Sequence, residues 1–197
     1  MSGRRLTLDD IADARAYERE RSAFRERIIA LKRIRRVGVG PVVSMVFENR
    51  DTVRFQIQEM ARVERLLSDQ AIQVELDTYN PLVPEPGELS ASLFIELVDR
   101  QEMEHWLPRL VGIEQSARIE LGDAGVVAAV VDPAHAANLT REEITAAVHF
   151  VRFQLSPAQV ELFRTEPVAV AFDHPGYRER TALGEETRAS LLADLLG

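Results

Sequence analysis

Charged and hydrogen-bonding side chains recur along one predicted helix in the first third of the chain. Arg50, Arg54 and Gln58 are spaced four residues apart, so they share one helix face. The free amide groups at a helix start favour an anion, and arginine binds carboxylate or phosphate through two parallel hydrogen bonds. The spacing therefore predicts a site for a small anion. Asp51 and Glu48 lie beside the arginines and leave a second interpretation open, an exposed ion-pair network.

Histidine and arginine side chains alternate along a predicted strand at residues 147–155. His149 shares a face with the apolar Val151 and Phe153, whereas Arg152 lies on the opposite face. A histidine on an apolar face is commonly a hydrogen-bonded core residue, but it can also serve as a pocket base or a metal ligand. Both interpretations of His149 stay open, and Arg152 is expected to help close the anion site.

The sequence Asp173-His174-Pro175-Gly176-Tyr177 follows another predicted strand. Proline and glycine end the strand there and predict a turn. Asp173 and His174 can act as an acid/base pair, although Asp and Tyr side chains also stabilise turns without any catalytic role. The catalytic candidates are therefore His149, His174 and Asp173, and Tyr177 is a candidate contact for the ligand.

Metal ligands are sparse in this sequence. Glu102 and His105 have the three-residue spacing of di-iron helical bundles, but that spacing occurs once and the bundles use it twice. A mononuclear site formed by His149, His174 and a carboxylate is the alternative. The chain has no cysteine, which excludes thiolate-held clusters and thiol nucleophiles. We expect neither a bound metal nor another cofactor.

The charge distribution argues against a protein built mainly to bind nucleic acid. The net charge is −8 and the isoelectric point is about 5.1, although residues 1–40 carry a net charge of +5. The basic residues 32–36 end a predicted helix, where the helix dipole favours cations. The glycine-rich phosphate loops and the serine-hydrolase motif are absent from the sequence, which disfavours nucleoside triphosphatases, dinucleotide-binding folds and serine hydrolases.

Hydrophobic periodicity predicts a helix-rich first half and a strand-rich second half. The predicted helices are residues 17–36, 50–67 with Asn49 as its cap, 69–79 with Ser68 as its cap, 99–107, 157–165 and 183–196. The predicted strands are residues 42–47, 92–98, 118–121, 126–131, 147–155 and 168–172. The apolar stripe of the second helix is expected to comprise Val53, Ile57, Met60 and Leu67. Residues 126–131 are apolar on both faces, which predicts a central strand covered by helices.

These elements predict an α+β fold in which a mostly antiparallel sheet packs with several helices. We expect one domain over residues 1–197, with a basic helical segment at 1–36 and a proline-rich loop at 80–88. No apolar run reaches the roughly 20 residues that span a bilayer. A cytoplasmic protein that does not enter the membrane is therefore expected.

Five stretches carry a family resemblance: residues 6–10, 24–32, 47–60, 148–153 and 173–177. Through them the chain resembles the uncharacterised bacterial domain-of-unknown-function 3501 family over nearly its whole length. The resemblance implies no catalytic residues, but it does imply partners among rubrerythrin-like and iron–sulfur oxidoreductase proteins. We therefore expect a non-enzymatic accessory or interaction protein that works with such a redox partner. The alternative is an enzyme or sensor that binds a small anion in a pocket lined by arginine and histidine.

Overall fold

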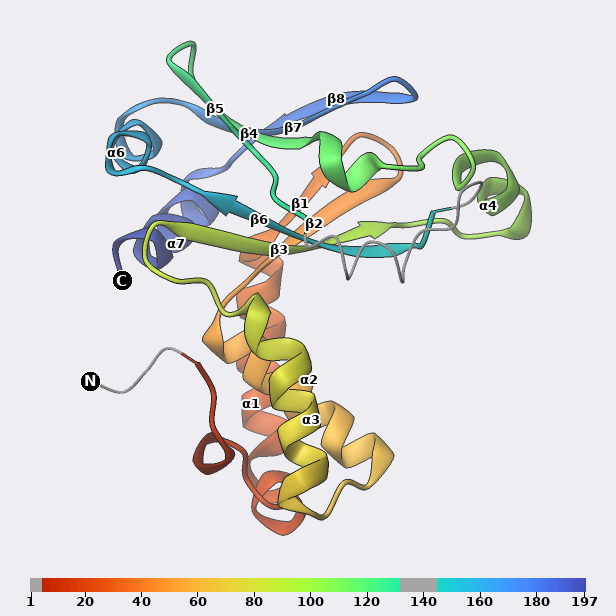
Figure 1. The fold of residues 1–197 in the computed structure, drawn as a ribbon, viewed down its shortest axis with the longest axis vertical. Helices are drawn as coiled ribbons and strands as arrows, with labels where there is room; N and C mark the ends of the chain where they lie inside the picture. Colours follow the sequence, from red (N-terminus) through yellow and green to blue (C-terminus); the bar gives the residue numbers. More distant parts are fainter. Residues whose placement is uncertain (1–4, 132–144) are drawn as a thin grey trace.

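A β-sandwich and a helical arm that projects from it make up the protein (Figure 1). The computed structural model describes residues 5–131 and 145–197. Both sheets are antiparallel and have four strands each. The expected α+β fold with mostly antiparallel pairing is therefore confirmed.

The lower sheet in Figure 1 carries the arm on its outer face and has the strand order β1-β2-β3-β6. Its strands are β1 (Arg36–Val39), β2 (Val43–Glu48), β3 (Glu88–Ile95) and β6 (Val148–Gln154). Alternate residues of β3 point to opposite faces. Leu89, Ala91 and Leu93 enter the sandwich core, and Ser90 and Ser92 lie on the outer face.

The upper sheet has the strand order β5-β4-β7-β8. Its strands are β4 (Ala117–Leu121), β5 (Gly125–Ala128), β7 (Val168–His174) and β8 (Tyr177–Ala182). A bridge between Val130 and Arg152 joins the two sheets at one edge. Side chains from the inner faces of both sheets form one large hydrophobic cluster, which includes Phe47, Phe153 and Phe172.

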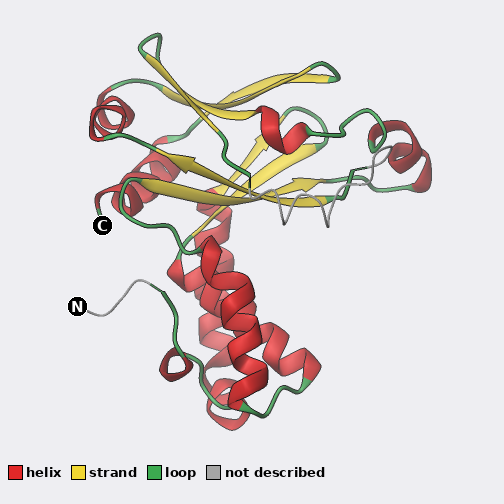
Figure 2. Ribbon diagram, in the orientation of Figure 1, coloured by secondary structure: helices red, strands yellow, loops and turns green. Residues whose placement is uncertain are grey.

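Three helices form the arm (Figure 2). They are α1 (Ala14–Arg35), α2 (Arg50–Glu64) and α3 (Asp69–Tyr79). A 3-10 helix, η1 (Leu8–Asp10), precedes them. Two smaller hydrophobic clusters hold the arm together, one around Ile57 and Leu76 and the other around Tyr17 and Phe24.

The remaining helices lie around the sandwich (Figure 2). They are α4 (Arg100–Trp106), α6 (Pro157–Thr165), α7 (Glu185–Leu196) and the 3-10 helices η2 (Asn80–Leu82) and η3 (Ile113–Ser116). Side-chain caps start several helices of the molecule, among them Asn49 for α2 and Ser68 for α3, both as predicted, and Ser156 for α6. Each cap satisfies an amide group that has no partner inside its helix.

The predicted helix at 50–67 is too long. Helix α2 ends at Glu64, and Arg65 adopts the left-handed conformation with φ 56°. Leu67 consequently lies outside the helix and is 84% exposed, so its assignment to the buried stripe was wrong. Val53 and Ile57 are buried as expected, whereas Met60 is only partly buried and Ala61 takes the place beside Ile57.

Residues 126–131 do not form a central strand. β5 is an edge strand of the upper sheet, and Val126 and Val130 are more than half exposed. A tight turn after β4 pairs β5 with β4 alone. The segment therefore lies at the edge of the sheet even though its residues are apolar on both faces. Strands β1 and β8 were missed because one follows a long helix without a break and the other is rich in charged residues.

The proline-rich stretch 80–88 contains more regular structure than expected. The 3-10 helix η2 includes Pro81, and β3 begins at Glu88, four residues before the predicted strand.

Within the described parts of the chain, no helix combines the length and apolar character needed to cross a membrane.

Candidate functional site

Arg50, Arg54 and Gln58 face one surface of α2, and the N-terminal segment covers that surface. Nη2 of Arg50 donates to Oδ1 of Asp10 at 2.5 Å. Arg54 donates from Nε to the Asp10 carbonyl and from Nη2 to Glu20, both at 2.7 Å. These acidic and carbonyl oxygens lie where the predicted anion would contact the arginines. The anion site itself stays a prediction.

The Gln58 side chain pairs with the backbone of Ala12 in both directions. Its Oε1 accepts from the Ala12 amide at 2.7 Å, and its Nε2 donates to the Ala12 carbonyl at 3.2 Å. Only 2% of Gln58 is exposed. Buried amide groups need such partners because leaving one unpaired costs about 1–3 kcal/mol. Gln58 therefore fixes the position of the segment that leads into α1.

The carboxylate of Asp10 is stabilised in its charged form. Partial burial tends to raise the pKa of Asp10, but hydrogen bonds from the Thr7 backbone and from Arg50 outweigh it, so the pKa lies below its usual value. Asp10 also accepts from the Thr7 amide at 2.8 Å, which closes the cap of η1. One carboxylate thus ties η1 to α2.

A second polar network on the arm joins α1 to α2. Glu59 accepts two hydrogen bonds from Arg21 at 2.8 and 2.9 Å and a third from the Tyr17 hydroxyl at 2.7 Å. The Arg21 guanidinium lowers the pKa of Glu59 to about 2. Burial, and then the hydrogen bond to Glu59, raises the pKa of Tyr17. Sequence reasoning assigned no role to Tyr17 or Arg21, because Glu59 lies 42 and 38 residues away from them.

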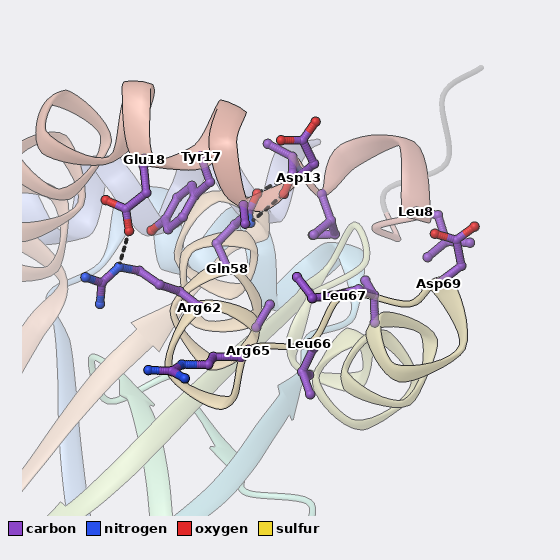
Figure 3. A pocket seen from close by; sticks show the side chains of 15 residues that line it. Leu8, Asp13, Tyr17, Glu18, Gln58, Arg62, Arg65, Leu66, Leu67 and Asp69 are labelled. Carbon is purple, nitrogen blue, oxygen red and sulfur yellow. Dashed lines mark hydrogen bonds and ion pairs between the residues drawn. The ribbon is translucent and has the colours of Figure 1, made fainter.

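A cleft lies at the far end of the arm, between the start of α1, the end of α2 and the start of α3 (Figure 3). Its volume is about 400 Å³. The lining residues are mainly apolar and include Leu8, Ile11, Ala12, Tyr17, Ala61, Leu66, Leu67 and Ile72. Charged side chains lie among them, and Arg62 forms an ion pair with Glu18 at 2.5 Å.

One exposed apolar side chain lies at the edge of this cleft. Leu67 lines the cleft from the turn after α2 and is 84% exposed. An exposed side chain of this size beside an apolar cleft is a feature of binding surfaces. Sequence reasoning missed this site because it placed Leu67 in the buried stripe. The adjacent Leu66 and Leu67 before the Ser68 cap are the signal that could have revealed an apolar turn.

His149 points into the sandwich, as predicted, and 1% of it is exposed. Its Nε2 lies 2.8 Å from the Thr145 hydroxyl and 2.9 Å from the Ala146 carbonyl. Its Nδ1 faces Oε2 of the buried Glu114 at 3.7 Å, and that carboxylate oxygen has no hydrogen-bond partner in the described structure. The arrangement is a buried, hydrogen-bonded histidine beside a carboxylate.

His174 and Asp173 do not pair with each other. Nε2 of His174 donates to the Val111 carbonyl at 3.0 Å, and Nδ1 accepts from the Gly176 amide at 3.1 Å. These partners require the neutral tautomer with its proton on Nε2. Asp173 instead forms ion pairs with Arg118 and Arg178. The two catalytic candidates therefore stabilise the turn between β7 and β8 in this structure.

Tyr177 links the two sheets. Its hydroxyl donates to the Val39 carbonyl at 2.6 Å and accepts from the amides of Val42 and Val43 at 3.2 Å. Those three bonds use the full hydrogen-bonding capacity of a hydroxyl group. Gly40 in the same turn has φ 71°, and a side chain there would collide with the Tyr177 hydroxyl. Tyr177 thus has no hydrogen-bonding capacity left for a ligand.

Arg152, the remaining candidate contact, lies on β6 and is held at the sandwich edge. Its Nη1 is 3.6 Å from Oε1 of Glu88. Its backbone makes the bridge to Val130 that joins the sheets. The structure therefore gives Arg152 a structural partner, whereas its predicted role at the anion site stays untested.

Histidines and carboxylates do not gather into a metal site in the described part of the chain. Residues 5–131 and 145–197 contain no group of three or more potential ligands. Glu102 accepts from the Val98 amide and His105 contacts Arg109, so this pair has partners other than a metal. His135 lies outside the described residues.

Comparison with known proteins agrees with the sequence resemblance. Residues 5–195 match a family described as protein of unknown function (DUF3501). A crystal structure of a novel protein of unknown function from Burkholderia pseudomallei K96243 is 36% identical, with a TM-score of 0.88. The match covers 96% of this chain and 98% of that one. No curated protein shows significant similarity to the chain.

Proposed function

The chain belongs to the DUF3501 family, and from that premise we propose that it is a non-enzymatic accessory protein that docks to a redox protein through the end of its helical arm. The observation that carries the proposal is the apolar cleft of about 400 Å³ beside the exposed Leu67. Burying one leucine side chain contributes about 1.5–3 kcal/mol. When a partner inserts an apolar side chain into the cleft, both that side chain and the apolar residues of the cleft lose contact with water, and both burials stabilise the complex.

The position of the cleft supports docking. The residues that line it belong to the end of the arm, and the arm projects away from the sandwich (Figure 1), so a second protein can approach the cleft. Its charged lining residues carry both signs, for example Arg65 and Asp69. An apolar centre within a polar rim is the usual anatomy of a protein interface.

The partner class comes from the family resemblance, which points to rubrerythrin-like or iron–sulfur oxidoreductase proteins. Such a partner supplies the redox centre, and this chain, which has no cysteine, contributes the binding surface. The partner places an apolar side chain between Leu66, Leu67 and Ile72, which line the cleft.

Affinity purification from native cells tests the proposal. Wild-type protein is compared with Leu67→Glu, and Val126→Glu serves as the matched control because Val126 is a 55% exposed valine on a sheet edge. We expect wild type and Val126→Glu to recover the same iron–sulfur or rubrerythrin-like protein, and Leu67→Glu to lose it. Equal recovery by the wild type and both variants, or recovery of chaperones and ribosomal proteins alone, contradicts the proposal. Self-association that Leu67→Glu abolishes also contradicts it, because the occupant of the cleft is then a second copy.

A further inference from the structure

A smaller pocket lies where the arm meets the outer face of the lower sheet. Its volume is about 160 Å³. Residues from α1, α2, α3, β2, β3 and β6 line it, so it exists only when the arm is seated on the sheet. This volume is below the roughly 300–1,000 Å³ of typical pockets for drug-sized ligands. The pocket therefore suits a compact ligand.

The floor of the pocket carries a buried carboxylate. Only 6% of Glu48 is exposed and 4% of Ser92. Oε1 of Glu48 accepts from the Ser92 hydroxyl at 2.6 Å, whereas no described residue donates a hydrogen bond to Oε2. Oε2 is not among the fully buried oxygens that lack a partner, so it keeps access to the pocket. A cationic donor that enters the pocket can therefore reach it.

Lys32 provides the opposite charge. It is the single lysine in a chain with 24 lysine and arginine residues. It lines the pocket from α1 and forms no hydrogen bond or ion pair with the described residues. An ammonium group offers three donors in a compact head. It is therefore available to a carboxylate that enters the pocket.

Aromatic side chains supply the walls. Tyr79, Phe94 and Phe150 line the pocket, and on the outer face of the sheet Ser92 lies directly opposite Phe150. Aromatic faces bury apolar groups and also attract ammonium groups. The pocket thus combines a cation, a buried carboxylate and an apolar wall within one small volume.

From this combination we infer that the pocket binds a small zwitterion, an α-amino acid with an apolar side chain or a similarly compact ammonium carboxylate. Lys32 pairs with the ligand carboxylate, Oε2 of Glu48 accepts from the ligand ammonium, and the rings cover the side chain. A simple carboxylate fits less well because it gives Glu48 no donor. A simple amine fits less well because it gives Lys32 no acceptor.

Thermal shift and calorimetric titration with the standard L-amino acids test the inference on the full-length protein. We expect one or a few apolar amino acids to raise the melting temperature of the wild type at millimolar concentration. The N-acetyl and amide forms of the same amino acid each lack one charge and should bind at least about tenfold more weakly. Lys32→Met and Glu48→Gln should weaken binding of the free amino acid by a similar factor.

Both variants are expected to fold, because Lys32 makes no described polar contact and glutamine retains an oxygen for Ser92. A bound amino acid should also protect Lys32 from limited acetylation, which gives a second readout. Lys32 is the single lysine, and the mass of the acetylated peptide distinguishes it from an N-terminal amine. The inference is overturned if no amino acid shifts the melting temperature, if the N-acetyl form binds as well as the free amino acid, or if Lys32→Met binds as tightly as the wild type.

Discussion

The residues of α2 show what helical spacing can predict about a site and what it cannot. The spacing of Arg50, Arg54 and Gln58 correctly predicted that they face one surface. It did not predict what covers that surface, because Asp10 and Glu20 lie 40 and 34 residues away from their partners. Local periodicity predicts the direction in which a side chain points. Its partner depends on which distant segment of the chain the tertiary structure brings beside it. The same holds for His149, whose direction was predicted and whose neighbour Glu114 was not.

Glu59 provides a test at the level of one carboxylate. Its pKa is about 2 in the folded protein and its ordinary value is 4.5, so the charged form stabilises the fold. That stabilisation is present above about pH 4.5 and is lost as the pH falls towards 2. Glu59→Gln should lower the free energy of unfolding by about 1–3 kcal/mol at pH 7, and the difference from the wild type should shrink at pH 3. Urea denaturation at both pH values measures it.

The matched control is Glu161→Gln. Glu161 also pairs with an arginine, Arg164, but both side chains are more than half exposed. Exposed pairs contribute little because solvent screens them, so this variant should unfold nearly like the wild type. A difference between Glu59→Gln and the wild type that stays constant from pH 7 to pH 3 would show that the Arg21 pair does not stabilise the fold.

Whole elements were predictable where their own sequence carries both a period and a cap. The capped helices α3 and α6 have the predicted bounds, because Ser68 and Ser156 bind the first free amides. β1 and β8 were not predictable in the same way. Each becomes a strand by pairing with its neighbour in the sequence, β1 with β2 and β8 with β7. The contact between β1 and β8 joins the sheets.

The Tyr177 link tests that element-level account. Tyr177→Phe removes a hydroxyl that satisfies the Val39 carbonyl and the amides of Val42 and Val43. Leaving these groups unpaired should lower the free energy of unfolding by about 1–3 kcal/mol, measured by urea denaturation. Tyr79→Phe is the control, because the Tyr79 hydroxyl has no hydrogen bond with described residues, and it should change stability little. Equal effects of the two variants would show that the link between the sheets contributes nothing.

At the scale of the whole molecule, the described hydrophobic residues form one cluster in the sandwich and two in the arm. Composition and length predicted one domain, which stays a prediction, but they could not reveal that a helical arm projects from the sheets. That shape depends on where β1 and β2 place the end of α1 and the start of α2. The buried Arg35 joins the parts, since it donates to the carbonyls of Phe47 and Glu48 and pairs with Asp194 of α7.

Because the Arg35 contacts connect the arm to the sandwich, we expect the two parts to unfold together. Trp106, the single tryptophan, packs against the sandwich core, whereas far-ultraviolet circular dichroism is dominated by the helices. The two signals should give coincident denaturation curves. Arg35→Met should lower both midpoints equally. A helical signal that is lost at a lower urea concentration than the tryptophan signal would establish the arm as a separate unit.

Docking of the arm to a redox protein should depend on the cleft at its end, so the purified partner should bind wild-type and Leu67→Glu protein with different affinities. Calorimetric titration measures both affinities, with Val126→Glu as the control. We expect Leu67→Glu to bind at least about tenfold more weakly, which corresponds to about 1.4 kcal/mol, and Val126→Glu to bind like the wild type. Equal affinity of Leu67→Glu and the wild type would contradict docking through this cleft.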